Sequence, residues 1–383
     1  MVTITSAENA LKSVYLGAVT ELLNARVNPL MTKIDQTTSD VWGKEIRKAV
    51  SVGINGGIGA GDETGGLPAA HGNNYLQFVA TLKNLYGQIE ISDKAIRASA
   101  DDRGAFTDLL NAEIDGLLQA SKFNLGRMLY GDGSGLLTTV SAVTGNSVDV
   151  EDTRNLIEGL AVDFYNGDTV VFRNAHITAV DHTNLVIKLD KTPTGAAAGN
   201  GIYVQGSKDK EITGLGAIFD TKRPLYGVDR SASAMLSPIV KEDVGTISEI
   251  VMQDAVDRLE TETGANVDFI AVSGDVKYAY MDYMAQYKRN IDVMNLDGGF
   301  KSLSFNGVPL VYDRFVPKGT MYLLDTSVFH LHQLCDWRFL ETENGNILRQ
   351  NQGFPVYTAT LVKYCDLVCD RPNGQAVLRG ITA

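Results

Sequence analysis

The sequence predicts an α+β fold with a long β-ribbon, one very long helix and a small all-β insertion. Three observations predict it. Two strand-like segments between residues 44 and 92 enclose a glycine-rich stretch, residues 104–130 repeat apolar residues at helical spacing, and residues 137–215 alternate apolar and polar residues between turn signals. We expect two or three modest domains, because 383 residues exceed the usual size of one.

The acidic composition limits the classes of function. The chain has a formal net charge of -12, with 44% hydrophobic and 21% charged residues, which suits a globular protein with a substantial core. Proteins that bind nucleic acids through the phosphates usually present a basic face, whereas the lysines and arginines here are scattered. An acidic chain repels DNA, so it suits a container better than a DNA-binding protein.

The cysteines and the N-terminus indicate a reduced, cytosolic product. The odd number of cysteines (Cys335, Cys365 and Cys369) argues against a disulfide framework. Cys365 and Cys369 lie four residues apart in a strand-like segment and share one face, so we expect small buried hydrophobic residues; a zinc site needs further ligands at short spacing. The N-terminus lacks a signal peptide, and no stretch approaches the roughly 18 apolar residues of a membrane span.

The first hundred residues predict a helix followed by a ribbon. Residues 6–31 have the apolar spacing of an amphipathic helix that ends at Asn28-Pro29 and packs on another surface, such as a neighbouring subunit. Residues 44–92 then predict a long β-ribbon, whose two strands are separated by a stretch with eight glycines from Gly53 to Gly72. In a monomer this ribbon exposes two strand edges, which proteins avoid unless a partner covers them.

Phosphate binding is the alternative interpretation of these glycines. A P-loop needs a lysine at its end, yet no lysine occurs between Lys48 and Lys83. The dinucleotide pattern GxGxxG fails as well, since the sixth position from Gly57 is Asp62, and a strand rather than a helix follows. We therefore favour a pliable ribbon tip over a nucleotide site.

The middle of the chain predicts a spine helix and an insertion. A helix over residues 104–130 would be about 40 Å long and would end at the glycines of residues 131–135. The all-β texture of residues 137–215 indicates a small barrel or sandwich inserted into a host domain. Its scattered aspartates do not match an EF-hand loop, and turn formation explains them better than calcium binding.

Beyond Pro238 the chain becomes mixed α/β. We expect a helix over residues 246–264, a buried strand at 267–274, a second helix at 275–288, and then strands to the end. The terminal strands, within residues 354–370 and 376–381, need an earlier partner. We expect the spine region to provide it, which makes that domain discontinuous.

No catalytic, cofactor or metal site is predicted. His330 and His332 share one face of a strand, with only Cys335 and Asp336 nearby as further ligands, so packing or surface roles are the simpler interpretation. Neither a GxSxG elbow, nor an HExxH helix, nor a Cys-His nucleophile arrangement occurs.

The order of these elements resembles the tailed-bacteriophage major capsid proteins, which have the HK97-type capsid fold. Local likenesses support this resemblance over residues 1–140 and 215–383: YGDGSG after the spine helix, NGVPLVYDRFVPKGTMYLLD from residue 306, and the final segment from Asp336 to Ile381. The resemblance implies the following domains: N-terminal arm 1–43, E-loop 44–92, P-domain 93–136 and 341–383, all-β insertion domain 137–215 on the outer surface, and A-domain with its linker 216–340.

The resemblance implies a structural function without catalysis. Such a subunit self-assembles into hexamers and pentamers that form the icosahedral shell of a virion around phage double-stranded DNA, which it does not bind specifically. Assembly takes place in the host cytoplasm, and the expected partners are a separate scaffolding protein, a portal and, optionally, a decoration protein, without membrane or cofactor. An encapsulin-type nanocompartment shell protein has the same architecture and is an alternative; an enzyme that binds a phosphorylated ligand is another, of a different class.

Two departures from the family pattern are visible. Many family members begin with a scaffolding segment that a protease removes, whereas this chain starts directly at the arm. Some members also link their subunits by a Lys-Asn isopeptide bond from the E-loop. Residues 53–75 contain no lysine, so we expect a shell that is held together non-covalently.

Overall fold

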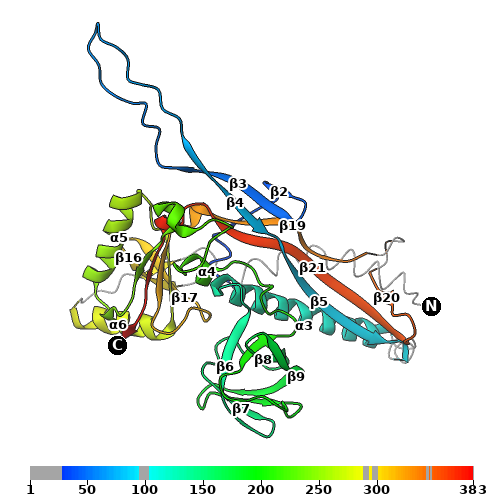
Figure 1. The fold of residues 1–383 in the computed structure, drawn as a ribbon. Helices are drawn as coiled ribbons and strands as arrows, with labels where there is room; N and C mark the ends of the chain where they lie inside the picture. The colour runs from blue at the N-terminus through cyan, green and yellow to red at the C-terminus, as the bar shows by residue number, and fades with distance from the viewer. Residues whose placement is uncertain are drawn as a thin grey trace.

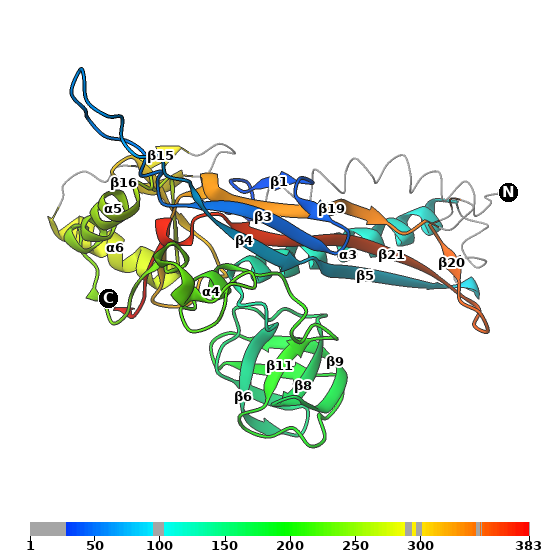
Figure 2. The ribbon, with the colours of Figure 1, turned by 45° about the horizontal axis from the view of Figure 1, so that its top comes forward.

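The computed structural model of the protein describes residues 28–94, 103–287, 293–295, 301–341, 345 and 347–382. It has a long twisted sheet on helix α3, a smaller α/β unit, a β-barrel and a ribbon that projects from the body (Figures 1 and 2). The helix predicted over residues 6–31 lies outside the described residues except at its end, where residues 29–33 form turns. Pro29 lacks the N–H group that a helix interior needs, which is consistent with the predicted end.

The spine helix is confirmed as α3, Arg103–Tyr130. Its side chains Ile114, Leu118 and Leu125 are buried at helical spacing and pack beneath the long sheet. At Gly87 the sheet comes so close that an added Cβ would lie 2.7 Å from a methyl group of Leu117. A larger residue at this position would displace the side chain of Leu117.

The predicted ribbon is confirmed in its first half and corrected in its second. Strands β3 (Glu45–Val52) and β4 (Asn74–Thr81) pair antiparallel along their whole length. After Leu82 the chain continues as β5 (Lys83–Ser92), which leaves the ribbon and pairs with β21 in the long sheet. The extended run of residues 74–92 is therefore divided between two sheets.

The long sheet has β21 (Val356–Cys369) at its centre. Strand β5 pairs with it on one edge and β19 (Phe329–Phe339) on the other, while β1 (Asp35–Thr37) runs parallel to β19 and the short β20 (Arg349–Gln350) pairs near the start of β21. The terminal strand within residues 354–370 thus lies in the sheet that packs on the spine helix, but its partners, β5 and β19, come from outside the spine region that the sequence predicts.

The smaller unit is a seven-stranded sheet with two helices on one face. Its order is β12-β22-β18-β14-β17-β16-β15, and α5 (Glu249–Thr263) and α6 (Gly274–Tyr287) pack against it. Its strands are Ile239–Lys241 (β12), Ala376–Leu378 (β22), Met321–Leu324 (β18), Phe269–Val272 (β14), Val308–Tyr312 (β17), Lys301–Phe305 (β16) and Val293–Asn295 (β15). Because side chains alternate along a strand, Ile270 and Val272 face these helices while Phe269 and Ala271 face the core around α3.

The expected partner of the last strands is wrong. β22 pairs with β12 and β18 in the seven-stranded sheet, and β23 (Ile381–Thr382) pairs with β13 (Gly245–Thr246), so neither joins the spine region. All three side chains of β22 are buried, and a strand between two others in a sheet covered on both faces provides such burial. Conversely, β19 lies in the long sheet although the sequence placed it with residues 216–340.

The insertion is a closed barrel with its own core. Strands β6 (Leu136–Thr144), β7 (Ser147–Val150), β8 (Ala161–Asn166), β9 (Thr169–Asp181), β10 (Val186–Leu189) and β11 (Gly201–Val204) close in the order β10-β7-β6-β11-β8-β9. Buried apolar side chains such as Phe164 and Ile187 fill its interior. Turn formation explains its aspartates: Asp181 accepts hydrogen bonds from the N–H groups of Thr183 (2.9 Å) and Asn184 (3.0 Å).

Helix α5 provides a first testable prediction. It ends at Gly264, whose φ of 63° lies in the left-handed region, as the sequence predicts, and it begins after Ser248, whose side chain accepts a hydrogen bond from the N–H of Val251. We expect Ser248→Ala to lower the free energy of unfolding by about 1 kcal/mol, because one N–H group loses its acceptor. Urea denaturation checks this. Ser248→Asp, which retains an acceptor, should remain close to wild type.

Candidate assembly surfaces

The first candidate surface is the loop at the end of the ribbon, residues 53–73, which we call the ribbon loop. It projects away from the body of the subunit (Figure 1). Three of its apolar side chains are almost completely exposed, at 84% for Ile54, 78% for Ile58 and 94% for Leu67. Exposed apolar side chains on a segment without contacts to the core indicate a surface that another chain covers.

The base of the ribbon is fixed to the long sheet by a strained tyrosine. Tyr226 has a φ of 49°, in the left-handed region that bulky residues rarely adopt. Its carbonyl accepts a hydrogen bond from the N–H of Val79 on β4 (2.9 Å), and its buried hydroxyl donates to Leu367 C=O (3.2 Å) and accepts from Cys369 N–H (2.9 Å). Tyr226 therefore connects the ribbon, through its carbonyl, to the end of β21, through its hydroxyl.

His330 and His332 lie near this junction but contact different partners. His330 lies between two carboxylates, 3.4 Å from Asp370 and 3.7 Å from Asp35, and Lys48 on β3 pairs with Asp370 at 2.6 Å. His332 is 1% exposed, and its Nδ1 lies 2.9 Å from the carbonyl oxygen of Ser39. They serve as packing and contact residues that join β1, β3 and β19. Within the described residues, no three His, Cys, Asp or Glu side chains gather as metal ligands would.

The cysteines are placed as the sequence predicts. Cys365 and Cys369 are completely buried in β21, and burial raises the pKa of the Cys365 thiol to about 12. A thiol of that pKa stays protonated at neutral pH and behaves as a small hydrophobic group.

His332 makes the stability of this junction depend on pH. A carbonyl only accepts, so Nδ1 carries the proton, and Nε2 is buried without a hydrogen-bond partner. Burial lowers the pKa of His332, helped by the positive charge of Lys48. The unfolded chain, with a histidine pKa of about 6.5, therefore binds more protons than the folded chain below that pH. We expect the contribution of His332 to stability to be complete above this pH and to decrease as the pH falls through its lowered pKa.

A comparison with His332→Gln isolates this contribution. Burial raises the pKa of Asp366 to about 6, so that carboxyl stabilises the fold on acidification and partly masks the histidine in wild-type melting curves. A glutamine amide can still donate to Ser39 but does not titrate. We expect the melting temperature of wild type to exceed that of the variant at pH 8, with a difference that shrinks towards pH 5. A difference independent of pH would contradict the assignment.

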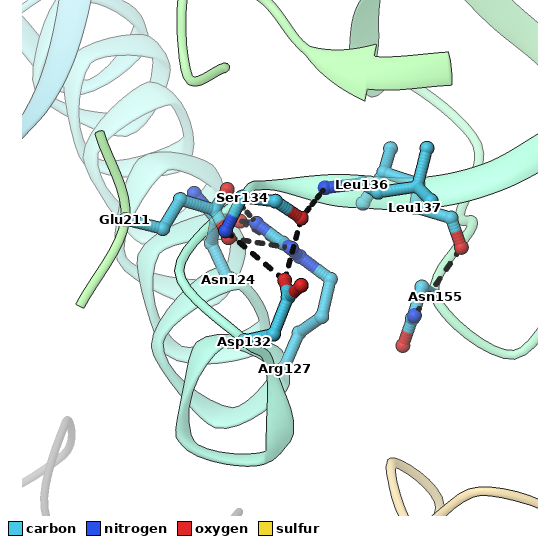
Figure 3. Close-up of polar contacts among 8 residues, drawn as sticks. All are labelled: Asn124, Arg127, Asp132, Ser134, Leu136, Leu137, Asn155 and Glu211. Atoms are coloured by element: carbon cyan, nitrogen blue, oxygen red, sulfur yellow. Dashed lines mark hydrogen bonds and ion pairs between the residues drawn. The ribbon is translucent and has the colours of Figure 1, made fainter. Parts of the chain in front are cut away.

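The second candidate surface is the barrel, which is attached to the spine helix by a buried ion pair (Figure 3). Arg127 of α3 and Glu211, on the segment that returns from the barrel, are 3% and 2% exposed. The guanidinium donates to both carboxylate oxygens, one bond measuring 2.8 Å, and also to the Asn124 side chain at 2.6 Å. A two-point pair of this kind fixes an angle as well as a distance.

A second group of contacts holds the segment that leads from the end of α3 into the barrel. Asp132 accepts a hydrogen bond from the N–H of Ser134 (3.0 Å) and pairs with Arg223 (2.9 Å). Burial alone would raise the pKa of Asp132, but the hydrogen bonds from Ser134 and the charge of Arg223 hold this pKa below its usual value. Beyond it, the Asn155 side chain donates to Leu137 C=O (3.4 Å) (Figure 3). Both connections between the barrel and the spine helix are thus held by side-chain contacts.

Comparisons with solved structures define the class of fold. The chain superposes on a subunit of the cyanophage A-1(L) capsid with a TM-score of 0.57 and 14% sequence identity, over 95% of this chain and 93% of that one. The chain therefore has the fold of this capsid subunit. It is the HK97-type capsid fold that the order of elements in the sequence predicts.

Two further structures match with TM-scores below 0.5. A subunit of the satellite phage P4 procapsid gives 0.46 at 11% identity, over 97% of this chain and 100% of that one. The SrpI encapsulin from Synechococcus elongatus gives 0.46 at 12% identity, over 96% and 95%. No protein-family model matches the sequence, and no curated protein does.

The sequence does not reveal the residues that fix the two projections. Tyr226, Arg127 and Glu211 belong to no motif, and each acts through a partner far away in the sequence. One local signal is present for Tyr226, because Gly227 with its φ of 75° follows it and indicates a tight turn.

Proposed function

We propose that this chain is the major capsid protein of a tailed bacteriophage and that it assembles into hexamers and pentamers of an icosahedral shell. The ribbon loop is the observation that carries the proposal. It exposes Ile54, Ile58 and Leu67, and exposed apolar side chains on a projecting segment favour a contact with a neighbouring chain. The fold shared with a capsid subunit supports the same proposal.

Other exposed apolar side chains support repeated contacts between copies. Ile250 on α5 is 79% exposed, Tyr278 on α6 is 71% exposed, and Trp42 beside the ribbon base is 71% exposed. These side chains belong to different parts of the subunit, as contacts that close around symmetry axes require. Many modest contacts made together stabilise a shell by raising the effective concentration of each next contact.

The domain limits follow from the same proposal. We assign the E-loop to residues 44–92, the P-domain to 93–136 and 341–383, the insertion domain to 137–215 and the A-domain with its linker to 216–340. Three strands depart from these ranges, because β5 and β19 belong to the long sheet over the spine helix and β22 belongs to the seven-stranded sheet.

We propose that the shell encloses DNA without binding it specifically and that the chain performs no catalysis. Glu113 and Asp115 are exposed on the spine helix and would repel phosphates. The glycines of residues 53–72 lie in an exposed loop that β4 follows, whereas phosphate binding uses a loop that opens a helix. No helix of the described residues is long and apolar enough to cross a membrane. A scaffolding protein, a portal and a decoration protein are the further partners we propose for a virion protein.

Electron microscopy of the purified protein in negative stain, after size exclusion, tests the proposal. We expect closed shells or rings of five or six subunits. A folded species that stays monomeric across salt and protein concentrations would overturn the proposal. Closed shells that form without partners and enclose a specific protein cargo would instead favour the encapsulin alternative.

A further inference from the structure

We infer that Lys363 forms a covalent isopeptide bond with Gln333 of the neighbouring strand, with release of ammonia and without the help of another protein. Lys363 lies on β21 and Gln333 on β19, which pair with each other in the long sheet (Figure 2). The bond joins two strands of one subunit and forms once per chain, as a self-modification. It therefore goes beyond the proposed function and does not depend on assembly.

The side chain of Lys363 is enclosed to an extent that lysines rarely reach. It is 0% exposed, whereas most lysines keep their charged end in water. Gln333 is 8% exposed, and the buried ring of Trp337 lies beside the ammonium group, with 6.0 Å between the nitrogen and the ring centroid. The amine and the amide are thus held together in a site with little access to bulk water.

The distances at Lys363 bring the reacting groups into contact. Its Nζ donates hydrogen bonds to Oε1 of Gln333 and to Oδ1 of Asp336, both at 2.6 Å. Because a C=O bond is about 1.2 Å long, the amide carbon of Gln333 lies within about 4 Å of Nζ. Groups held this close within one fold react at an effective concentration far above any that they reach in solution.

Asp336 is placed to move the protons of this reaction. Its carboxylate first accepts a proton from the Lys363 ammonium, and the lone pair of the neutral amine then forms a bond to Cδ of Gln333. Asp336 passes that proton to the amide nitrogen of Gln333, and the bond between this nitrogen and Cδ breaks. The lysine nitrogen loses its second proton to the departing ammonia, which leaves as ammonium. Asp336 ends as a carboxylate, and no oxidant or other reagent is consumed.

The surroundings favour Gln333 as the partner and also favour the product. Gln36 of β1 offers a second amide, but its Oε1 is farther from Nζ, at 3.4 Å. The reaction replaces an enclosed cation by a neutral amide, which removes the cost of keeping that charge out of water. Asp336 then loses its cation at a position where its side chain is 29% exposed, and it still accepts a hydrogen bond from the N–H of Trp337 at 2.8 Å.

The intact mass of the purified chain tests the inference. We expect most wild-type chains to be lighter than their sequence by one molecule of ammonia. Lys363→Met, which lacks the amine, and Asp336→Ala, which lacks the proton acceptor, should both have the full mass. Gln36→Met should keep the loss. Lys188→Met is the matched control, because it replaces an exposed lysine of the barrel and should keep the loss as well.

Peptide mapping of wild type gives the same answer without a variant, so it does not depend on whether Lys363→Met folds. Trypsin does not cleave after an acylated lysine, so the expected product is residues 319–338 joined to residues 350–379. Wild-type chains of full mass would overturn the inference, and so would an ammonia loss that persists in Lys363→Met. Loss of water with a link to Asp336 would contradict Gln333 as the partner. None of these results bears on shell formation, so the proposed function would stand.

Discussion

Replacement of residues 53–73 by a two-residue Asn-Gly turn is expected to abolish particle formation and to leave the subunit folded. The register of the ribbon ends at Val52 opposite Asn74, so a two-residue turn joins β3 to β4 without changing their pairing. The ribbon loop contributes no buried side chain to the subunit, and a shorter connection loses less entropy on closure. Thermal unfolding should therefore show a monomer at least as stable as wild type.

The expected effect on assembly is large because each copy loses a contact that recurs throughout the shell. Sedimentation and electron microscopy measure it as the loss of particles. A variant that keeps the full loop but carries Ile54→Ser, Ile58→Ser and Leu67→Ser is the matched control for length. We expect this variant to assemble poorly as well. Normal shells from the shortened variant would show that the loop is not an assembly surface.

The sequence predicts those parts of the molecule whose signals are local. The spine helix repeats apolar residues every three or four positions, and a helix needs only that spacing and a stop at the following glycines to be recognised. The barrel is predicted as all-β for the same reason, because alternation and turn residues are local properties. The glycines of residues 53–72 are a local signal as well, and they indicate a long loop.

Strand partners and junctions depend on contacts between distant segments, which the sequence pattern does not contain. Nothing within residues 74–92 indicates that the strand changes sheets at Leu82, because β21, the new partner of β5, lies far away in the chain. Likewise, β22 is an apolar run that fits either sheet, and only the position of β12 and β18 decides between them. The bond between His332 and Ser39 crosses 293 positions.

The two candidate surfaces also differ in how far the sequence predicts them. The exposed loop is predictable because its composition prevents it from folding alone. The attachment of the barrel is not, because Arg127 of α3 and Glu211 of the segment after the barrel meet only in the folded subunit.

Loss of the buried cation at the barrel attachment is the second change from which we expect a large effect. Arg127→Met leaves the carboxylate of Glu211, which is 2% exposed, without its partner. Because an unpaired charge in the interior keeps its desolvation cost, we expect the free energy of unfolding to fall by about 3–5 kcal/mol. Chemical denaturation followed by tryptophan fluorescence measures this loss, since Trp337 and Glu211 line the same cavity.

Two companion variants separate the charge effect from the loss of packing. The double variant Arg127→Met, Glu211→Leu removes both charges and should be more stable than the single variant, because no buried charge remains. Arg258→Met breaks an exposed pair with Glu262 in α5, at 50% and 51% exposure, and should cost less than about 0.5 kcal/mol. If the double variant is as unstable as Arg127→Met alone, the instability comes from the lost hydrogen bonds and packing of these two side chains and not from an unpaired buried charge.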